Sequence, residues 1–379
     1  MTTRVLHLAG SAVSEFLAGL SRLYAADCLA ATADPGRYEF HVAYVTPDGQ
    51  WRFPAGLSPE AIRAAAPMPL AGAVRQLTAL RPDVMVPQMF CLPGMTSYRA
   101  LFDVLSIPYV GSPPGVMALG ARKPHAKAVV AAAGVRVPPG EVLRPGGQPS
   151  LAPPAVVKPA DGDNSLGVTL VRDRGGYPAA LDAAFAHSGE ALVESFVELG
   201  REVRCGIVVR DGELVCLPLE EYNVSRDARP IRQYADKISQ NEGGDLSLVA
   251  KDTTRAWIVD PGDPITRRVQ AAARRCHAAL GCRDYSLFDF RVDPDGEPWF
   301  LEAGLYCSFA RKSVIPVMAA AAGIPLPELF RQAIQQRTGH GLRPLVSRYA
   351  ARVAAVDVGV PPDDQPRAGV ARACAVCVR

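Results

Sequence analysis

The chain has 379 residues, a length that suits two or three domains and a sizeable hydrophobic core. Hydrophobic residues make up 49%, charged residues 21%, and the formal net charge is only +3, so nothing in the composition indicates a nucleic-acid or anionic-membrane partner. No apolar run is long enough for a secretory signal or a membrane span, and we expect a cytoplasmic protein. The nine cysteines are scattered as reduced thiols are, and Cys374 and Cys377 lack the further ligands that a zinc site needs.

The first part of the chain alternates strands with helices. Apolar runs predict four strands, at residues 4–10, 40–45, 83–87 and 107–111. Apolar spacing of three and four residues predicts a helix from Ser14 to about residue 31. This alternation favours a parallel, doubly wound sheet, whose ligands bind at the carboxyl ends of the strands. Here those ends are residues 10–15 and the turn after Val86.

The middle of the chain combines a helix at residues 116–133 with strands that form antiparallel pairs. The strands are predicted at residues 154–159, 167–171, 191–196, 203–209 and 214–219. Asp211 and Gly212 form a hairpin turn between the last two. Residues 222–264 are polar, and they predict a long loop over a functional site.

Two helices and a hairpin complete the predicted fold. The helices are expected at residues 265–280 and 314–336, and a further strand is possible at 353–358. The predicted domains are residues 1–113 (doubly wound), 114–220 (central, α+β), 221–341 (C-terminal) and 342–379 (an extension to which we assign no function).

The hairpin at residues 288–302 carries the clearest chemical signal. Pro294, Asp295 and Gly296 form a turn between two apolar strands. Asp289 and Glu302 lie inside these strands, where burial disfavours a carboxylate. Two acids buried across a hairpin need cations to balance their charge. Their oxygen atoms are few and would be completed by phosphate and water, and such a ligand set suits Mg²⁺.

Lys158 ends an apolar strand and is followed by a loop that contains Gly162 and Gly167. A lysine and backbone donors in that arrangement can bind a polyphosphate. A strand-terminal lysine can equally extend to solvent, and Lys123 near a helix start is no more specific when taken alone.

The whole set of motifs resembles the ATP-grasp fold and, more narrowly, the D-alanine–D-alanine ligase family. The motifs in chain order are Lys123, Lys158 with its glycine-bearing loop, Leu192–Val197, Gly200–Val203, Lys237, Asp289 and Glu302. Similarity extends from about Val5 to Gln336 and includes connecting segments at residues 107–112, 131–135 and 316–324. The resemblance implies an α/β ATP-grasp fold with a doubly wound N-terminal domain, an α+β central domain and a C-terminal domain with the metal-binding hairpin. It also suggests a homodimer.

The resemblance assigns roles to these residues. Lys123 and Lys158 would contact the phosphates and the adenine region of ATP. The adenine-binding hinge would consist of Glu194, Ser195, Phe196 and Val197. Glu202 would bind the ribose, Lys237 would close on the γ-phosphate, and Asp289 and Glu302 would bind Mg²⁺. The implied reaction joins two amino-acid-like substrates through an acyl phosphate, protected from water by a lid.

On the substrate side, Glu15 occupies the position of a family glutamate that binds the first amino acid's ammonium group. An exposed acid in a first helical turn is an equally good explanation, because the helix dipole favours it there. Ser165 and Ser313 match serines that contact substrate in the family.

The departures from the family concern the second substrate. Where the family has an arginine before the metal-binding aspartate the chain has Leu287, and where it has an asparagine after the glutamate the chain has Gly304. Loss of an oxyanion guanidinium would cost roughly 3 kcal/mol of transition-state stabilisation unless another cation replaces it. Arg291, two residues from Asp289 on the same strand face, is a candidate. Other candidates are Arg311 and Lys312. Further departures are Met89-Phe90 for a His-Gly pair and Ser308–Arg311 for a Gly-Met-Thr-Ser segment.

Three hypotheses remain open from the sequence. The first is an ATP-dependent ligase whose second substrate differs from D-alanine or is bound differently. The second is an ordinary D-alanine–D-alanine ligase of peptidoglycan synthesis with compensating substitutions. The third is a degenerate protein that binds nucleotide without ligating anything, although the retained lysines and acids argue against it.

Overall fold

The computed structural model describes residues 2–162, 165–225, 230–231, 239–240, 246–247 and 255–339. The predicted strand at 353–358 and the rest of the extension at 342–379 lie outside the described residues. Among the described residues, no single helix is long and apolar enough to cross a membrane; two helices near residue 323 pass that test only as a pair bent by 110°.

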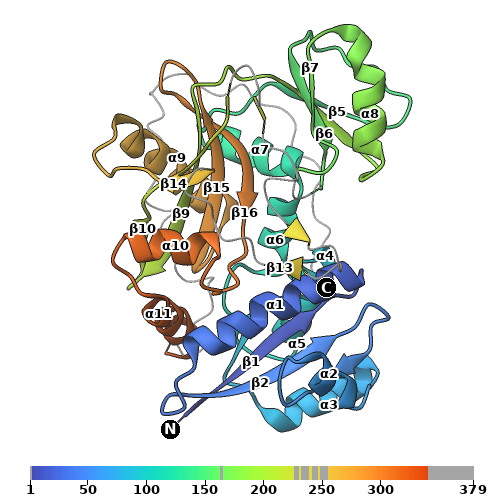
Figure 1. The fold of residues 1–379 in the computed structure, drawn as a ribbon, viewed down its shortest axis with the longest axis vertical. Coiled ribbons are helices and arrows are strands. Elements are labelled where there is room, and N and C mark those ends of the chain that lie inside the picture. The colour runs from blue at the N-terminus through green and yellow to red at the C-terminus, as the bar shows by residue number, and fades with distance from the viewer. Residues whose placement is uncertain are drawn as a thin grey trace, which may run out of the picture. The chain divides into compact units, whose positions relative to one another are not determined.

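The first sheet has the strand order β3-β2-β1-β4, with β1 parallel to both β2 and β4 (Figure 1). Its elements are β1 (Thr3–Gly10), α1 (Glu15–Thr32), β2 (Tyr38–Val45), β3 (Trp51–Arg52), α2 (Pro59–Ala64), α3 (Leu70–Leu80), β4 (Val84–Pro87), α4 (Leu92–Met95) and α5 (Ser97–Val104). Ser14 caps α1 by accepting a hydrogen bond from the Leu17 N–H. The predicted strand at 107–111 is reduced to one bridge between Met85 and Tyr109. Pro108 lacks an N–H, which weakens a ladder there.

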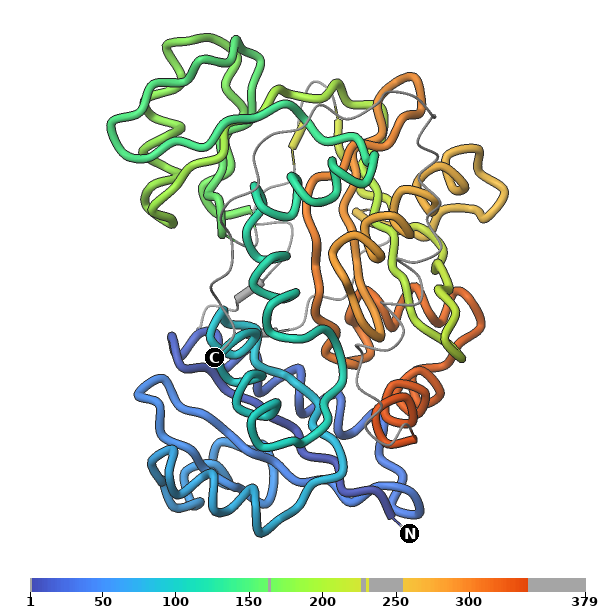
Figure 2. Tube along the Cα trace, turned by 180° about the vertical axis from the view of Figure 1, so that it is seen from behind, coloured from blue at the N-terminus to red at the C-terminus, as the bar shows by residue number. Residues whose placement is uncertain are grey.

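The predicted helix at 116–133 is two helices. They are α6 (Pro114–Ala121) and α7 (Lys123–Ala132). The break falls at Arg122, whose ψ is 100° and therefore not helical. Pro124 explains the break, since in a continuous helix a proline lacks the hydrogen bond to the carbonyl four residues earlier and its ring clashes with that carbonyl, whereas it suits the first turn of a new helix. The new helix begins at Lys123 and runs alongside strand β16 (Pro298–Gly304) of the largest sheet (Figure 2).

A four-stranded antiparallel sheet follows, in the order β5-β8-β6-β7. Its elements are β5 (Gly140–Leu143), β6 (Ala155–Pro159), β7 (Thr169–Val171), the short 3₁₀ turn η1 (Arg174–Gly176), α8 (Tyr177–Phe185) and β8 (Ala191–Ser195). Helix α8 covers this sheet, and Val157, Val193 and Ala184 are fully buried between them. The β6–β8 register pairs Val156 with Glu194, so Lys158 and Glu194 lie on one face of the sheet.

The largest sheet has the order β14-β11-β9-β15-β16, with β10 paired to β9. The elements are β9 (Arg201–Arg210), β10 (Glu213–Cys216), β11 (Glu220–Tyr222), β14 (Ala256–Ile258), α9 (Pro264–Leu280), β15 (Tyr285–Val292) and β16. The short pair β12 (Ser239–Gln240) and β13 (Leu246–Ser247) stands apart from it. The predicted hairpin is confirmed as β15 and β16, and Gly296 in its turn has a φ of 80° that favours glycine. Helix α9 packs on one face over Phe288 and Phe290, which leaves the opposite face for charged residues.

The predicted helix at 314–336 is also divided in two. The structure has α10 (Val314–Ala321) and α11 (Leu326–Thr338). Gly323 has a φ of 75°, and Pro325 precedes the second helix. A left-handed glycine followed by a proline ends a helix and starts another, so the continuous apolar pattern alone was misleading.

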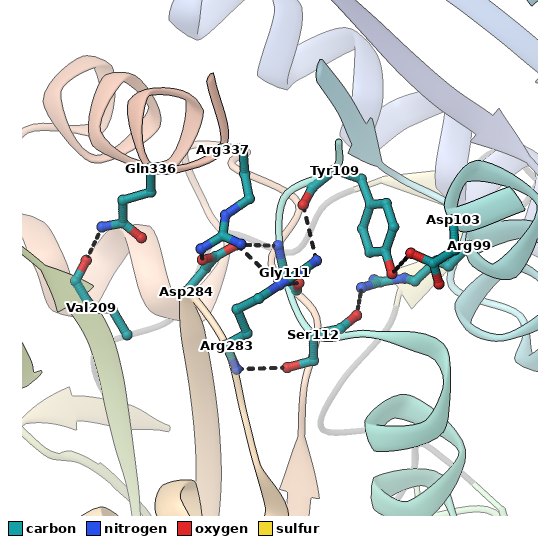
Figure 3. Close-up of polar contacts among 10 residues, drawn as sticks. All are labelled: Arg99, Asp103, Tyr109, Gly111, Ser112, Val209, Arg283, Asp284, Gln336 and Arg337. Atoms are coloured by element: carbon teal, nitrogen blue, oxygen red, sulfur yellow. Dashed lines mark hydrogen bonds and ion pairs between the residues drawn. The ribbon is translucent and has the colours of Figure 1, made fainter. Parts of the chain in front are cut away.

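A buried polar network joins the loop after α5 to the start of β15 (Figure 3). Asp284 accepts a hydrogen bond from the Gly111 N–H at 2.7 Å and pairs with Arg337 at 2.6 Å. Arg283 donates to the Gly111 carbonyl at 2.7 Å. Burial raises the pKa of Asp284 above its ordinary value, although Arg337 and Arg283 oppose the rise. These contacts fix the start of β15, and hence the acids farther along it, relative to the first sheet.

Candidate active site

A cleft of about 790 Å³, open to solvent, lies between the β5–β8 sheet and the hairpin strands β15 and β16. It brings together most of the predicted site residues. Those that line it are Lys123, Lys158, Ser165, Glu194, Ser195, Phe196, Val197, Glu202, Asp289, Arg291 and Glu302. These residues come from six separate segments of the chain, so their convergence supports one shared site.

Glu194 is the centre of a cluster of charges behind this cleft. It is 2% exposed, and its two carboxylate oxygens lie 2.7 Å from the Lys127 ammonium and 2.5 Å from the Lys158 ammonium. Burial alone would raise the pKa of Glu194, but the two lysines outweigh it and the pKa is lowered. Lys158 is therefore held at the cleft by a carboxylate rather than extended to solvent.

The segment after β8 is held by backbone hydrogen bonds. The Ser195 N–H donates to the Pro139 carbonyl at 2.9 Å, and the Phe196 N–H donates to the Pro154 carbonyl at 3.0 Å. The Phe196 ring and the Val197 carbonyl both face the guanidinium of Arg291, at 5.1 Å and 3.3 Å. These backbone groups are therefore already paired, and what Phe196 and Val197 can present to a flat ring such as a purine in the cleft is their apolar surface.

Arg291 contacts Glu202 rather than the hairpin acids. Its Nη2 atom lies 2.8 Å from the Glu202 carboxylate, and both residues are about 5% exposed. In the β9–β15 register Arg291 is opposite Glu202, whereas Leu287 lies four residues earlier in the strand, opposite Gly206. Arg291 and Asp289 do share one strand face, as predicted, but the guanidinium is directed to the hinge end of the cleft.

Asp289 and Glu302 are direct cross-strand partners in the hairpin. Lys123 lies 3.7 Å from Glu302, and Arg204 binds Asp289 through two contacts, at 2.6 Å and 3.1 Å. No group of three or more histidine, cysteine, aspartate or glutamate side chains suited to a metal occurs in the described part of the chain. Two adjacent carboxylates nevertheless fit a hard cation whose remaining ligands are phosphate oxygens and water.

Leu287 and Gly304 form the next pair along the same two strands. Leu287 is buried, and the three atoms nearest to a Cβ added at Gly304 all belong to Leu287, the first of them at 3.7 Å. The pair is therefore apolar and lacks both a cation and a further metal ligand. This is the end of the hairpin strands that lies nearer Tyr285 and the first sheet.

Glu15 and Ser313 are not among the described residues that line the cleft. Glu15 is exposed in the first turn of α1. Ser313 precedes α10, and its hydroxyl contacts that of Ser308, whose carbonyl accepts a hydrogen bond from Gln88 at 2.9 Å. Lys237 lies outside the described residues.

Two residues of the site were missed by the sequence analysis, Lys127 and Arg204. Lys127 follows Lys123 by four residues, which puts both on one face of α7. Arg204 follows Glu202 by two residues in an otherwise apolar strand, so its face could have been deduced from the alternation. Each residue becomes informative only when the partner element is known.

Comparisons with known proteins find relatives of the chain. The profile of a family described as D-ala D-ala ligase C-terminus matches residues 147–335. A D-alanine–D-alanine ligase from Citrifermentans bemidjiense is 32% identical over 243 residues, which are 63% of this chain and 73% of that protein. The vancomycin B-type resistance protein VanB of Enterococcus faecalis is 28% identical over 326 residues, covering 81% of this chain and 91% of VanB.

Solved structures share the fold. The D-Ala:D-Ser ligase VanG from Enterococcus faecalis superposes with a TM-score of 0.70 at 22% identity, covering 88% of this chain and 99% of VanG. A Bacillus anthracis D-alanine–D-alanine ligase complexed with ATP gives 0.64 at 20% identity, covering 90% of this chain and all of the other. The predicted fold class is thereby confirmed.

Proposed function

Because the chain belongs to the D-alanine–D-alanine ligase family, and is therefore an ATP-dependent ligase that forms a peptide bond, we propose that it joins an amino acid to a second substrate that it binds differently from the family. The proposal extends to an Mg²⁺ ion held by Asp289 and Glu302. The single observation that carries it is the apolar pair formed by Leu287 and Gly304, beside the acids, where the family has an arginine and an asparagine.

The residues at the hinge end of the cleft suit the nucleotide. Lys123 and Lys158 supply positive charge for phosphates, and Phe196 and Val197 offer an apolar surface for adenine. Glu202 is placed to accept hydrogen bonds from ribose hydroxyls. The Arg291 guanidinium, at 2.8 Å, orients that carboxylate.

The reaction needs little covalent help from the protein. A carboxylate oxygen of the first substrate forms a bond to the γ-phosphorus as the bond to the bridging oxygen of ADP breaks. The amine of the second substrate then attacks the acyl carbon, and phosphate leaves with the bonding electron pair while the amine loses a proton. Bound Mg²⁺ would neutralise charge on the phosphates. Asp289 and Glu302 would hold that ion, and Lys158, held in place by Glu194, is positioned to bind phosphate oxygens.

The apolar pair has a direct chemical consequence. A guanidinium opposite the forming oxyanion is worth about 3 kcal/mol, or more than a hundredfold in rate, and Leu287 cannot supply it. A second substrate with a carboxylate would also lose its arginine partner at this position. The acceptor is therefore selected by other contacts than in the family, and D-alanine is not its preferred acceptor.

An ADP-release assay tests the proposal. Purified full-length protein is incubated with ATP, Mg²⁺ and pairs of D- and L-amino acids and amines, with D-alanine alone as a separate reaction. We expect ADP release with at least one pair to exceed that with D-alanine. Preferred turnover of D-alanine would instead favour the ordinary peptidoglycan ligase. If the protein binds nucleotide but releases no ADP in any reaction, and Glu302→Gln leaves nucleotide binding unchanged, the result would favour a non-catalytic nucleotide-binding protein.

A further inference from the structure

Arg204 lies within a row of charged side chains that crosses the largest sheet. The strand register puts Glu220 of β11, Arg204 of β9, Asp289 of β15 and Glu302 of β16 opposite one another. Directly opposed residues of antiparallel strands project to the same face. Since Asp289 and Glu302 line the cleft, the row projects to that face of the sheet, although Arg204 and Glu220 are not themselves among the residues that line the cleft.

Arg204 binds Asp289 with good geometry for an arginine–carboxylate pair. Its Nε atom lies 2.6 Å from Oδ1 and its Nη2 atom 3.1 Å from Oδ2. The guanidinium also lies 5.1 Å from the centre of the Tyr222 ring. Burial disfavours the charged guanidinium, but Asp289 outweighs it, and the pKa of Arg204 is raised. Arg204 is therefore a permanent cation in contact with one of the two hairpin acids.

The adjacent row of the sheet consists of Gly206, Leu287 and Gly304. None of these residues carries a charge, and two of them have no side chain. Neighbouring rows on one strand face are roughly 7 Å apart, because the side-chain period is two residues of about 3.4 Å each. A long arginine side chain from the Arg204 row can extend over that distance.

The other cations of the cleft are directed elsewhere. Lys158 contacts Glu194, and Arg291 contacts Glu202, both toward the hinge. Lys123 is 3.7 Å from Glu302 and also donates to the Gly162 carbonyl of the glycine-bearing loop. Arg204 differs from these three cations, because its described partner is Asp289, which lies two residues from Leu287.

We propose that Arg204 transfers from Asp289 to the phosphoryl group when nucleotide and a divalent cation occupy the cleft, and so brings a guanidinium to the part of the cleft where position 287 carries none. This inference rests on the proposed function. A divalent cation on Asp289 repels the guanidinium and competes for the same carboxylate oxygens. Phosphoryl oxygens are strong two-point acceptors for a guanidinium. Arg204 stays protonated as the γ-phosphorus changes its oxygen partner, so it stabilises charge without giving up a proton.

The proposal predicts that Arg204 recognises the γ-phosphoryl group in particular. Isothermal titration calorimetry of the full-length protein with MgATP and MgADP gives the preference for ATP over ADP. In Arg204→Met we expect this preference to fall at least tenfold, with MgADP affinity within twofold of the starting protein. Arg204→Lys keeps the positive charge but loses the two-point hydrogen bonding of a guanidinium. In this variant the preference for ATP over ADP should fall by about threefold or more.

Two further variants separate recognition from structure. Arg201→Met is the matched control, because Arg201 lies on the same strand and binds Glu221 at 2.8 Å in a similar way but outside the cleft. We expect it to keep the ATP preference. Adding Leu287→Arg to Arg204→Met returns a guanidinium to the adjacent row and should recover at least part of the lost preference.

The outcomes distinguish this proposal from the proposed function. Equal loss of ATP and ADP affinity in Arg204→Met, or loss of neither, would overturn the role of Arg204. If Arg204→Met does not fold, an unchanged ATP preference in Arg204→Lys would overturn it as well. Failure of the starting protein itself to bind either nucleotide would instead refute the ATP-dependent function on which the inference rests.

Discussion

Lys127 gives the sharpest test of the electrostatics behind the cleft. It is buried in α7, with its ammonium 2.7 Å from Glu194 and 2.9 Å from the Phe300 carbonyl. Burial lowers the pKa of Lys127 from 10.5 to about 8, although Glu194 opposes the change. That difference corresponds to about 3 kcal/mol in favour of the neutral amine. The buried cation is therefore stable at neutral pH only because of its neighbours.

Two substitutions should move this pKa in opposite directions. Glu194→Gln removes the acid that favours the charged form, so the pKa of Lys127 should fall below 8. In the unaltered protein the nearby positive charge of Lys158 lowers the pKa of Lys127. Lys158→Met removes that charge, so the pKa of Lys127 should rise. An NMR titration of protein with ¹³C at the lysine ε position reads the ionisation of Lys127 directly. A value near 10.5 in the unaltered protein, or a shift of the same sign in both variants, would refute this account.

The same ionisation contributes to the pH dependence of stability. Below pH 8 both the folded and the unfolded chain carry the charged lysine, so the burial penalty is complete. Between pH 8 and 10.5 the unfolded chain retains a proton that the folded chain has released. Stability rises with pH wherever the unfolded state binds more protons, so the contribution of Lys127 should increase by about 3 kcal/mol across this window. Urea unfolding of the protein and of Lys127→Met, compared at both ends of the window, measures it.

Three other predictions concern the junction and the hairpin. Arg337→Met removes the cation 2.6 Å from buried Asp284, and should lower the free energy of unfolding by about 3 kcal/mol in urea titrations. Gly111→Ala should lower the free energy of unfolding by at least about 2 kcal/mol, because the φ of Gly111 is 92° and the new methyl would lie 2.5 Å from the Tyr285 hydroxyl. Gly115→Ala is the control: its added methyl meets nothing within 4 Å, so the free energy of unfolding should not fall. Glu302→Gln should reduce ADP release about a hundredfold while the melting temperature changes little; retained activity would exclude Glu302 as a metal ligand.

The fold was predictable where local signals and burial agree. The parallel strands β1, β2 and β4 and the hairpin β15–β16 followed from apolar runs and from turn residues with fixed backbone preferences. Both long helices were predicted without their breaks. At Arg122 and Gly323 the apolar pattern continues through a change of backbone direction, so periodicity alone does not reveal it.

The site was predictable at positions that match a motif along the chain. Which charges face one another depends instead on strand register, which no single motif contains. The contact between Arg204 and Asp289 joins residues 85 positions apart, and the Arg291 contact with Glu202 joins residues 89 apart. The sequence identified the face of Arg291 but not its partner.

The ion pairs around the cleft suggest how nucleotide and metal bind. Glu194 pairs with Lys158, Glu202 with Arg291, Asp289 with Arg204, and Glu302 lies near Lys123. Glu194 also keeps Lys127 as a partner, so the exchange concerns the pairs of the two hairpin acids. A polyphosphate that entered alone would draw Arg204 and Lys123 from these acids, and a metal that entered alone would draw the acids from these cations, so each would leave buried charges uncompensated. When both enter together, phosphates take Arg204 and Lys123 while the metal takes Asp289 and Glu302, and each of these four charges keeps a partner. The charge pattern therefore favours joint binding of ATP and Mg²⁺, while the apolar pair of Leu287 and Gly304 takes no part in this exchange and leaves acceptor choice to other contacts.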